Sequence, residues 1–154
     1  MDTITSIAMS VDCPGINEIG MILQNPAVYL AVIIALLLIG ERRNEKRVKV
    51  LFSLILTFLL VTGIKYVMAK ERPCVEGEWC PDGYSFPSTH AAIAFTLMTA
   101  FLNKKSYPAY LLFALFVAFT RLNLGVHTFY DVAGALPVAM ISYYITDVVW
   151  GRIK

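Results

Sequence analysis

The sequence is poor in charged side chains. Asp, Glu, Lys and Arg make up only 16% of the 154 residues, hydrophobic residues make up 58%, and the mean hydropathy is +0.66. A soluble domain usually carries about 25% charged residues, so this composition argues against one and favours a membrane protein. Internal repeats, low-complexity tracts and interdomain linkers are also absent, which predicts one membrane-embedded domain over residues 1–154.

Basic residues are missing from the start of the chain. Residues 1–19 contain no Lys or Arg, so they lack the basic region that begins a secretory signal peptide. Apolar Ile4, Ile7 and Val11 recur at helical spacing, which is typical of a short helix lying in the membrane interface. We therefore predict an interfacial helix at the N-terminus.

Apolar runs predict the fold class, an all-α polytopic bundle of about five transmembrane helices. The first run lacks charge over a length that spans roughly 30 Å as a helix, and Asn25 before Pro26 could cap a later start. The third and fourth runs reach only about 22 Å each, so we expect them to extend by a turn or to lie inside the bundle. The five runs are Gly20–Gly40, Val50–Ala69, Ser88–Leu102, Tyr107–Thr120 and Tyr130–Trp150.

The distribution of positive charge predicts the orientation of these helices. Five basic residues fall in the connection 41–49, two in 103–106 and two in the tail 151–154. Short basic connections stay in the cytoplasm, which places the N-terminus outside and the C-terminus inside in the plasma membrane. The other four of the 13 basic residues then lie toward the outer side, and they are Lys65, Lys70, Arg72 and Arg121.

A polar segment over Phe119–Asp131, FTRLNLGVHTFYD, carries residues suited to catalysis. If a helix begins near Gly125, His127 and Asp131 share one face. Asp131 then accepts a hydrogen bond from one ring nitrogen of His127, and the other nitrogen is free to act as a nucleophile. Arg121 beside this pair can hold a phosphate through two parallel hydrogen bonds. The alternative interpretation is a polar turn at the membrane surface.

Two outer cations precede this segment. In KYVMAKERP, Lys65 lies seven residues before Arg72, which places the two on one side of a continuous helix. Pro73 disfavours helix at Arg72, so their geometry stays open. The alternative for Lys65 is a side chain that extends to the membrane interface, and for Arg72 it is a solvated loop charge.

A second histidine lies at the start of an apolar run. In FPSTHAA, Ser88 or Thr89 is a candidate helix N-cap, and the unpaired N–H groups of a first helical turn form a ready anion site. His90 stands at that positive helix end, where a bound phosphate would favour its protonated form. The alternative is a plain capped helix with an exposed histidine.

Two of the three cysteines lie in the same outer loop. Cys74 and Cys80 flank VEGEW, and oxidising conditions outside the cytoplasm favour a disulfide between them. Cys13 is also predicted to be outside, so other pairings remain open. A zinc site that uses both loop cysteines and His90 is a weaker alternative, because it has only three evident ligands and would consume the histidine.

The three polar segments resemble the signature of the type 2 phosphatidic acid phosphatase superfamily of lipid phosphate phosphatases. In that family six residues separate a lysine from an Arg-Pro pair, a Pro-Ser-Gly-His element follows, and an arginine leads a histidine and an aspartate at fixed spacing. The matching segments here are Lys65–Pro73, Pro87–His90 and Arg121–Asp131. Order and spacing agree throughout. The resemblance implies a membrane phosphatase.

This chain departs from the family pattern at three points. Thr89 stands where the family usually has glycine, and Thr120 stands where serine commonly precedes the arginine. The five predicted spans fall one short of the six-helix core of the membrane members. The N-terminal segment, lying on the outer surface, is expected to replace the missing helix.

The resemblance implies a role for each matched residue. His127 would be the nucleophile that forms a phosphohistidine, Asp131 would orient its ring, and His90 would protonate the leaving oxygen and activate water. No metal or other cofactor is implied. Groups that would hold the phosphate oxygens lie at Lys65, Arg72, Ser88, Thr89 and Arg121.

The expected substrate is a lipid phosphate in the outer leaflet. The resemblance suggests a polyprenyl diphosphate of the undecaprenyl type, with phosphatidate or phosphatidylglycerophosphate as alternatives. An alternative interpretation, of a different functional class, is that the protein is a non-catalytic phospholipid-binding or transport module. A haloperoxidase-like relative would use the same anion cradle, but membrane spans argue against it. The expected partners are the lipid substrate and the bilayer, with no nucleic acid, and the oligomeric state is not indicated.

Overall fold

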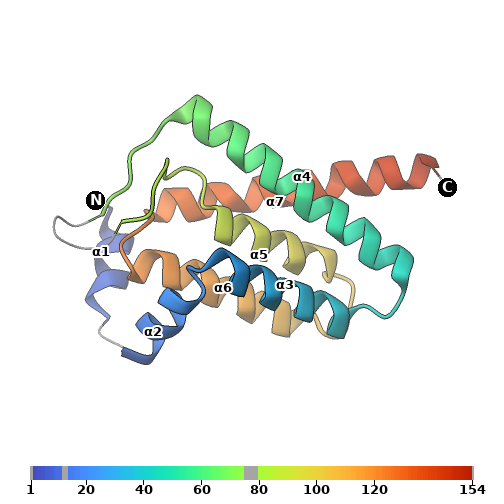
Figure 1. The fold of residues 1–154 in the computed structure, drawn as a ribbon, viewed down its shortest axis with the longest axis horizontal. Coiled ribbons are helices and arrows are strands. Elements are labelled where there is room, and N and C mark those ends of the chain that lie inside the picture. Colours follow the sequence, from blue (N-terminus) through green and yellow to red (C-terminus); the bar gives the residue numbers. More distant parts are fainter. Residues whose placement is uncertain (1, 12–13, 75–79, 154) are drawn as a thin grey trace.

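The computed structural model describes residues 2–11, 14–74 and 80–153, and its secondary structure over these residues is entirely helical (Figure 1). This confirms the all-α fold class. The helices of the described residues are α1 Thr3–Ser10, α2 Pro14–Ile22, α3 Pro26–Gly40, α4 Asn44–Met68, α5 Thr89–Ala100, α6 Tyr107–Asn123 and α7 Phe129–Ile153.

The five predicted spans correspond to α3–α7, but they differ in length. Among the described residues, α4 and α7 have 25 residues each and are long and apolar enough to cross a membrane. The bent pair α2–α3 would make a third span. The apolar α5 has 12 residues and α6 has 17. Five is therefore an approximate count, because α5 and α6 fall below the length of a full span.

The first predicted span begins at the later of the two starts that the sequence left open. Residues 20–40 break between α2 and α3, whose axes differ by 92°. The side chain of Asn25 accepts hydrogen bonds from the N–H groups of Ala27 (3.0 Å) and Val28 (3.3 Å). Pro26 has no N–H to continue a helix from the preceding turn. The chain therefore starts a new helix at the position that the Asn-Pro pair indicates.

Helix α5 is packed between α4, α6 and α7 (Figure 1). Three of its alanines, Ala91, Ala92 and Ala94, are fully buried, because small side chains let neighbouring helices approach closely. On the side facing α4, the hydroxyls of Thr96 and Thr57 lie 2.8 Å apart in a buried hydrogen bond. Each hydroxyl also lies within hydrogen-bond distance of the carbonyl four residues earlier in its own helix, so the hydroxyl that accepts across the interface can donate to that carbonyl.

The two ends of the bundle differ in character. At one end, Lys104 of the α5–α6 connection pairs with Glu41 of the α3–α4 connection at 2.8 Å, so the two basic connections lie together. Lys49 pairs nearby with Asp147 of α7. The end of α4 and the starts of α5 and α7 lie at the opposite end, beside α1 (Figure 1). That second end holds the polar segments on which the site depends.

Hydrogen bonds join α1 and the residue after it to the end of α6 and the start of α7. Thr5 Oγ1 accepts the N–H of Phe129 at 2.8 Å, and Asn123 Nδ2 donates to the carbonyls of Ala8 and Val11 at 2.8 and 3.0 Å. The apolar Ile4, Ile7 and Val11 stay exposed at 49%, 61% and 41%. This apolar face is what an interfacial helix presents to a bilayer.

Candidate active site

His127 lies in the turn before α7, and not within a helix. The predicted helix start near Gly125 is wrong: Gly125 takes a left-handed φ of 64°, and α7 begins at Phe129. Thr128 N donates to Asp131 Oδ2 at 2.7 Å, while Asp131 N lies 3.4 Å from Thr128 Oγ1. This reciprocal pairing is a capping arrangement. It orients Asp131 toward His127, in place of the predicted helical face.

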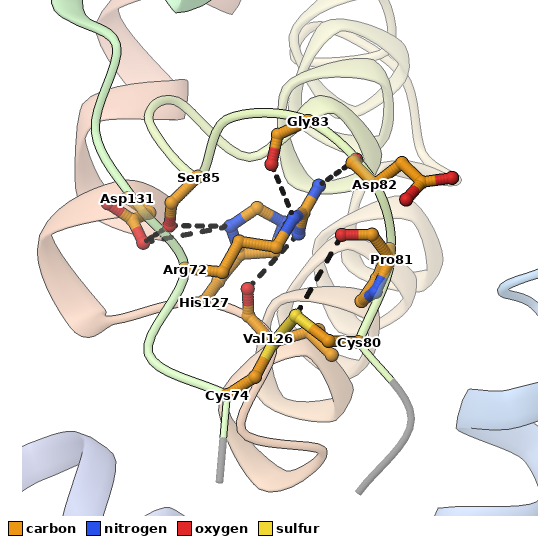
Figure 2. The surroundings of a disulfide bond; sticks show 10 residues. All are labelled: Arg72, Cys74, Cys80, Pro81, Asp82, Gly83, Ser85, Val126, His127 and Asp131. Atoms are coloured by element: carbon orange, nitrogen blue, oxygen red, sulfur yellow. Dashed lines mark hydrogen bonds and ion pairs between the residues drawn. A yellow bond between two sulfur atoms is a disulfide. The ribbon is translucent and has the colours of Figure 1, made fainter. Parts of the chain in front are cut away.

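The carboxylate of Asp131 faces the ring of His127 without a direct hydrogen bond. Asp131 Oδ2 and His127 Nδ1 are 3.6 Å apart, which is too long for one. Ser85 Oγ donates to Asp131 Oδ2 and lies 3.5 Å from His127 Nδ1 (Figure 2). Asp131 and Ser85 are fully buried, and His127 is 3% exposed. The hydroxyl of Ser85 thus forms a buried cluster with Asp131 and His127, and nothing in the sequence indicated its part in it.

Arg72 contacts the other nitrogen of the same ring. Its Nη1 lies 3.2 Å from His127 Nε2 (Figure 2). Arginine carries only donors, so Nε2 must offer its lone pair and the ring proton belongs on Nδ1, toward Asp131. The Arg72 guanidinium is held in place by the carbonyls of Val126 and Gly83, both at 3.1 Å. The predicted phosphate ligand is therefore already fixed beside the predicted nucleophile.

Burial sets the protonation state of His127. Loss of water around the ring lowers the pKa of His127 to about 4, and the charges of Arg72 and Lys65 act in the same direction. The nearby carboxylate of Asp131 opposes this lowering of the pKa but does not reverse it. His127 is accordingly neutral near pH 7, as a nucleophilic imidazole must be.

Lys65 reaches the loop that follows the disulfide. From the last turn of α4, its Nζ donates to the carbonyl of Tyr84 and lies 3.3 Å from that of Ser85. The side chain is therefore drawn over the site and does not extend to the membrane interface. Its charge also acts on His127. The two cations that the sequence placed seven residues apart thus meet around one imidazole.

The start of α5 supplies the second histidine and a buried hydroxyl. Ser88 is the N-cap of α5, and its N–H donates to the carbonyl of Asp131 at 3.0 Å. Ser88 Oγ is buried and has no hydrogen-bond partner among the described residues. The ring of His90 packs against that of Tyr29 at 4.6 Å. Arg121, His127 and Arg72 all lie near enough to act on the charge of His90.

Arg121 is fully buried at the end of α6. Its guanidinium donates to Gln24 Oε1, to the carbonyl of Gly20 at 2.8 Å and to Thr120 Oγ1 at 3.1 Å. In this structure the side chain joins α6 to the end of α2. The sequence indicated Arg121 as a phosphate ligand, but it did not indicate Gln24.

Cys74 and Cys80 form a disulfide with a Cα–Cα distance of 5.9 Å (Figure 2). Both sulfurs are used, so the zinc alternative with His90 is not available. The pairing of Cys13 falls outside the described residues. Thr89, the residue in place of the family glycine, opens α5 beside His90.

The helical bundle has the long apolar helices of an integral membrane protein, and a buried imidazole, a buried carboxylate and a half-buried guanidinium lie together at one end of it. Residues 46–153 match the model of the PAP2 superfamily. The match covers more than half of the chain, and the chain belongs to this superfamily. The resemblance noted in the sequence is confirmed.

Individual relatives support the same assignment. The undecaprenyl-diphosphatase of Sulfolobus acidocaldarius is 34% identical over 121 residues, which cover 71% of this chain and 58% of that protein. Human sphingosine-1-phosphate phosphatase 2 is 35% identical over 77 residues, covering 44% of this chain and 19% of that protein. The chain thus spans less than three fifths of the length of these curated relatives.

A solved structure shares the fold. The crystal structure of Aquifex aeolicus LpxE superposes with a TM-score of 0.76 at 22% identity, over 94% of this chain and 93% of that one. At this identity the likeness concerns the fold alone. The overall arrangement of the helices is therefore one that another protein also adopts.

Proposed function

We propose that the protein is a lipid phosphate phosphatase that hydrolyses a polyprenyl diphosphate through a phosphohistidine on His127. The observation that carries this proposal is the pair of contacts on one buried ring: Arg72 beside Nε2 at 3.2 Å and Asp131 facing Nδ1. A neutral histidine so placed has its lone pair directed at the group that would hold the phosphate. A membrane anchor or plain surface turn does not require this arrangement.

The chemistry proceeds in two displacements. Nε2 of His127 attacks phosphorus, the bond from phosphorus to the bridging oxygen breaks, and His90 gives its proton to that oxygen. Water then loses a proton to His90 as it attacks phosphorus. The nitrogen–phosphorus bond breaks and inorganic phosphate leaves. Asp131 stabilises the positive imidazole ring of the intermediate.

The phosphate oxygens are held by fixed positive groups. Arg72 turns from Nε2 to the phosphate, Lys65 lies beside it, and the unpartnered hydroxyl of Ser88 has a donor to offer. The N–H of Thr89 and the first turn of α5 add to the cradle. Arg121, in the last turn of α6, adds a positive charge near His90. These cations can neutralise the transferring phosphoryl group without a metal ion.

An apolar groove leads away from the site and suits a lipid tail. It has a volume of about 400 Å³ and runs between α3, α4 and α5 to the side of Thr89 and His90. Apart from these two residues, its walls come from Pro26, Tyr29, Leu30, Ile33, Ile34, Leu51, Leu54, Ile55, Phe58 and Ile93. A phosphate at His90 would place the attached hydrocarbon chain in this groove.

The site faces the extracytoplasmic side in this proposal. The two basic connections and the C-terminal end lie together at the end of the bundle opposite the site (Figure 1), and the positive-inside rule assigns such connections to the cytoplasm. The N-terminus and α1 would then lie on the outer surface. A disulfide at the site end fits the oxidising side of the plasma membrane.

The decisive assay separates a phosphatase from a phospholipid-binding module. Protein in lipid nanodiscs is given polyprenyl diphosphate, phosphatidate or phosphatidylglycerophosphate with excess chelator, and phosphate release is measured for wild type and His127→Ala. We expect release that depends on His127 and is fastest for the diphosphate. Tight binding of all three lipids without release would favour the binding module. Faster release from a glycerolipid would correct the substrate.

A further inference from the structure

Lys70 is an outer cation without an assigned role, and it lies against the buried carboxylate of the site. It follows Ala69, which ends α4 with a left-handed φ of 44°. Lys70 Nζ lies 2.6 Å from Asp131 Oδ1 and 2.9 Å from Thr128 Oγ1. Its side chain is 38% exposed, whereas that of Asp131 is 0% exposed. A lysine from the edge of the site thus closes over a carboxylate sealed from water.

The two oxygens of Asp131 have separate partners. Oδ2 accepts from Ser85 Oγ and from Thr128 N at 2.7 Å, and it faces His127 Nδ1. Among the described residues, Lys70 is the side chain bonded to Oδ1. The carbonyl of Lys70 also accepts the N–H of Ser85 at 2.7 Å. Lys70 and Ser85 therefore form one unit that holds both sides of the carboxylate.

Charge balance explains why a lysine stands there. While His127 is neutral, Asp131 has no ion-pair partner in its own dyad, and a buried carboxylate without a counter-charge is costly. Lys65, Arg72, His127 and Lys70 are the titratable groups that face Asp131. Of the three cations, Lys70 alone among the described residues makes a direct bond to it.

We propose that Lys70 is a positioning residue that fixes Asp131 in its ionised form with Oδ2 turned toward His127. The proposal rests on the phosphatase function proposed above. Lys70 acts through Asp131, because its ammonium contacts neither ring nitrogen of His127. Its loss would leave Oδ1 unpaired, so the carboxylate would rotate or take up a proton. The phosphohistidine would then lose its stabilising partner.

Kinetics distinguish this role from phosphate binding. We expect Lys70→Ala to lower kcat on the order of 10- to 100-fold, as loss of an orienting partner does elsewhere, with KM nearly unchanged. Lys70→Arg should restore most of the rate. The control is Glu71→Ala, the exposed neighbour in the same loop, which should behave as wild type. A raised KM with unchanged kcat would instead make Lys70 a substrate ligand and overturn the proposal.

A titration tests the coupling independently of turnover. The chain has only two histidines, so isotope-labelled imidazole signals can be assigned with a His90→Gln variant. If Lys70 keeps Asp131 ionised and turned toward the ring, its loss weakens the support that Asp131 gives to a proton on His127. The pKa of His127 should therefore fall in Lys70→Ala and stay unchanged in Glu71→Ala, and the acid limb of kcat/KM should move to lower pH with it. A rise, which loss of a positive charge alone would cause, would contradict the positioning role.

The outcomes separate the two proposals. An unshifted His127 titration together with a normal kcat in Lys70→Ala would overturn the role of Lys70, even if the protein is a phosphatase. A fall in the pKa of His127 in Lys70→Ala, together with a wild-type protein that releases no phosphate from any lipid, would instead overturn the phosphatase function while supporting the link from Lys70 through Asp131 to His127.

Discussion

Arg72 Nη1 lies 3.2 Å from His127 Nε2, so the cation expected to hold the phosphate contacts the atom expected to attack it. Nη1 also donates to the carbonyl of Val126, and the other two guanidinium nitrogens donate to the carbonyls of Gly83 and Asp82. The group is therefore preorganised around the position of the incoming phosphorus. In the proposed mechanism, substrate binding would exchange the contact of Arg72 with His127 for a contact with phosphate, which would free the lone pair of Nε2 for attack.

This contact predicts that charge alone cannot replace Arg72. Arg72→Lys keeps a positive charge but loses the planar, forked donor set that spans two carbonyls and a phosphate. We expect kcat/KM to fall about 100-fold, with Arg72→Ala lower still. Steady-state kinetics on the lipid diphosphate measure this. A lysine variant with near-normal kcat/KM would show that the fork is dispensable.

The low pKa of His127 predicts an acid limb near pH 4. His127 is neutral and competent above its pKa of about 4, so kcat/KM should hold through mildly acidic pH and fall below it. In the substrate complex the bound phosphate favours the proton on His90, so loss of that proton should give an alkaline limb in kcat, and the kcat profile should be bell-shaped. Flat activity from about pH 4 to about pH 9 would count against the two assigned histidine roles.

The same shift carries a stability prediction with a definite sign. Burial depresses the pKa of His127 below its usual value of about 6.5. The unfolded chain therefore binds this proton at a higher pH than the folded chain does. The free energy of unfolding keeps its full contribution from neutral His127 above about pH 6.5 and loses it as the pH falls through about 4. His127→Gln should weaken this part of the pH dependence in thermal unfolding. An identical pH dependence in the variant would contradict the shift.

Asp131→Asn tests whether the carboxylate must be charged. The amide keeps the shape of the side chain but has no negative charge to stabilise a positive imidazole. In one orientation its NH2 group would face Lys70, and in the other it would face Ser85. We expect kcat to fall roughly 10²- to 10⁴-fold by analogy with other oriented histidines. The variant is compared by phosphate release at saturating lipid. Less than a twofold loss would assign Asp131 to helix capping only.

The groove predicts a dependence on the lipid tail. Leu54→Trp fills the groove between α3, α4 and α5, so KM for a long-chain lipid diphosphate should rise while a short-chain, water-soluble phosphate ester is unaffected. Leu112→Trp is the matched control, because Leu112 on α6 is 67% exposed and lies outside the groove. Equal effects of both substitutions, or of one substitution on both substrates, would argue that the tail lies elsewhere.

Part of the candidate site could be predicted from the sequence, because the spacing of polar residues along the chain can be read directly. Lys65 and Arg72 from one segment and His127 from another were predicted to lie together, and they meet around one ring. The Asn25–Pro26 helix start was predictable for a similar reason, since capping and the missing proline N–H are local effects.

Other features depend on tertiary packing or on competition between local signals. Gly125 was a reasonable helix start by position, but Thr128 and Asp131 cap each other and delay α7 to Phe129. Ser85 carried no motif, and it meets Asp131 from 46 positions away. The bond from Arg121 to Gln24 joins residues 97 positions apart. Composition and periodicity do not encode such pairings.

Identification of the phosphorylated residue tests the central claim most directly. Protein in nanodiscs is mixed with terminally radiolabelled polyprenyl diphosphate, quenched within one turnover at alkaline pH, digested and mapped by mass spectrometry. We predict an acid-labile phosphate on His127, and none on the protein in His127→Ala. Label on His90, or steady phosphate release by His127→Ala, would contradict the assignment of His127 as the nucleophile.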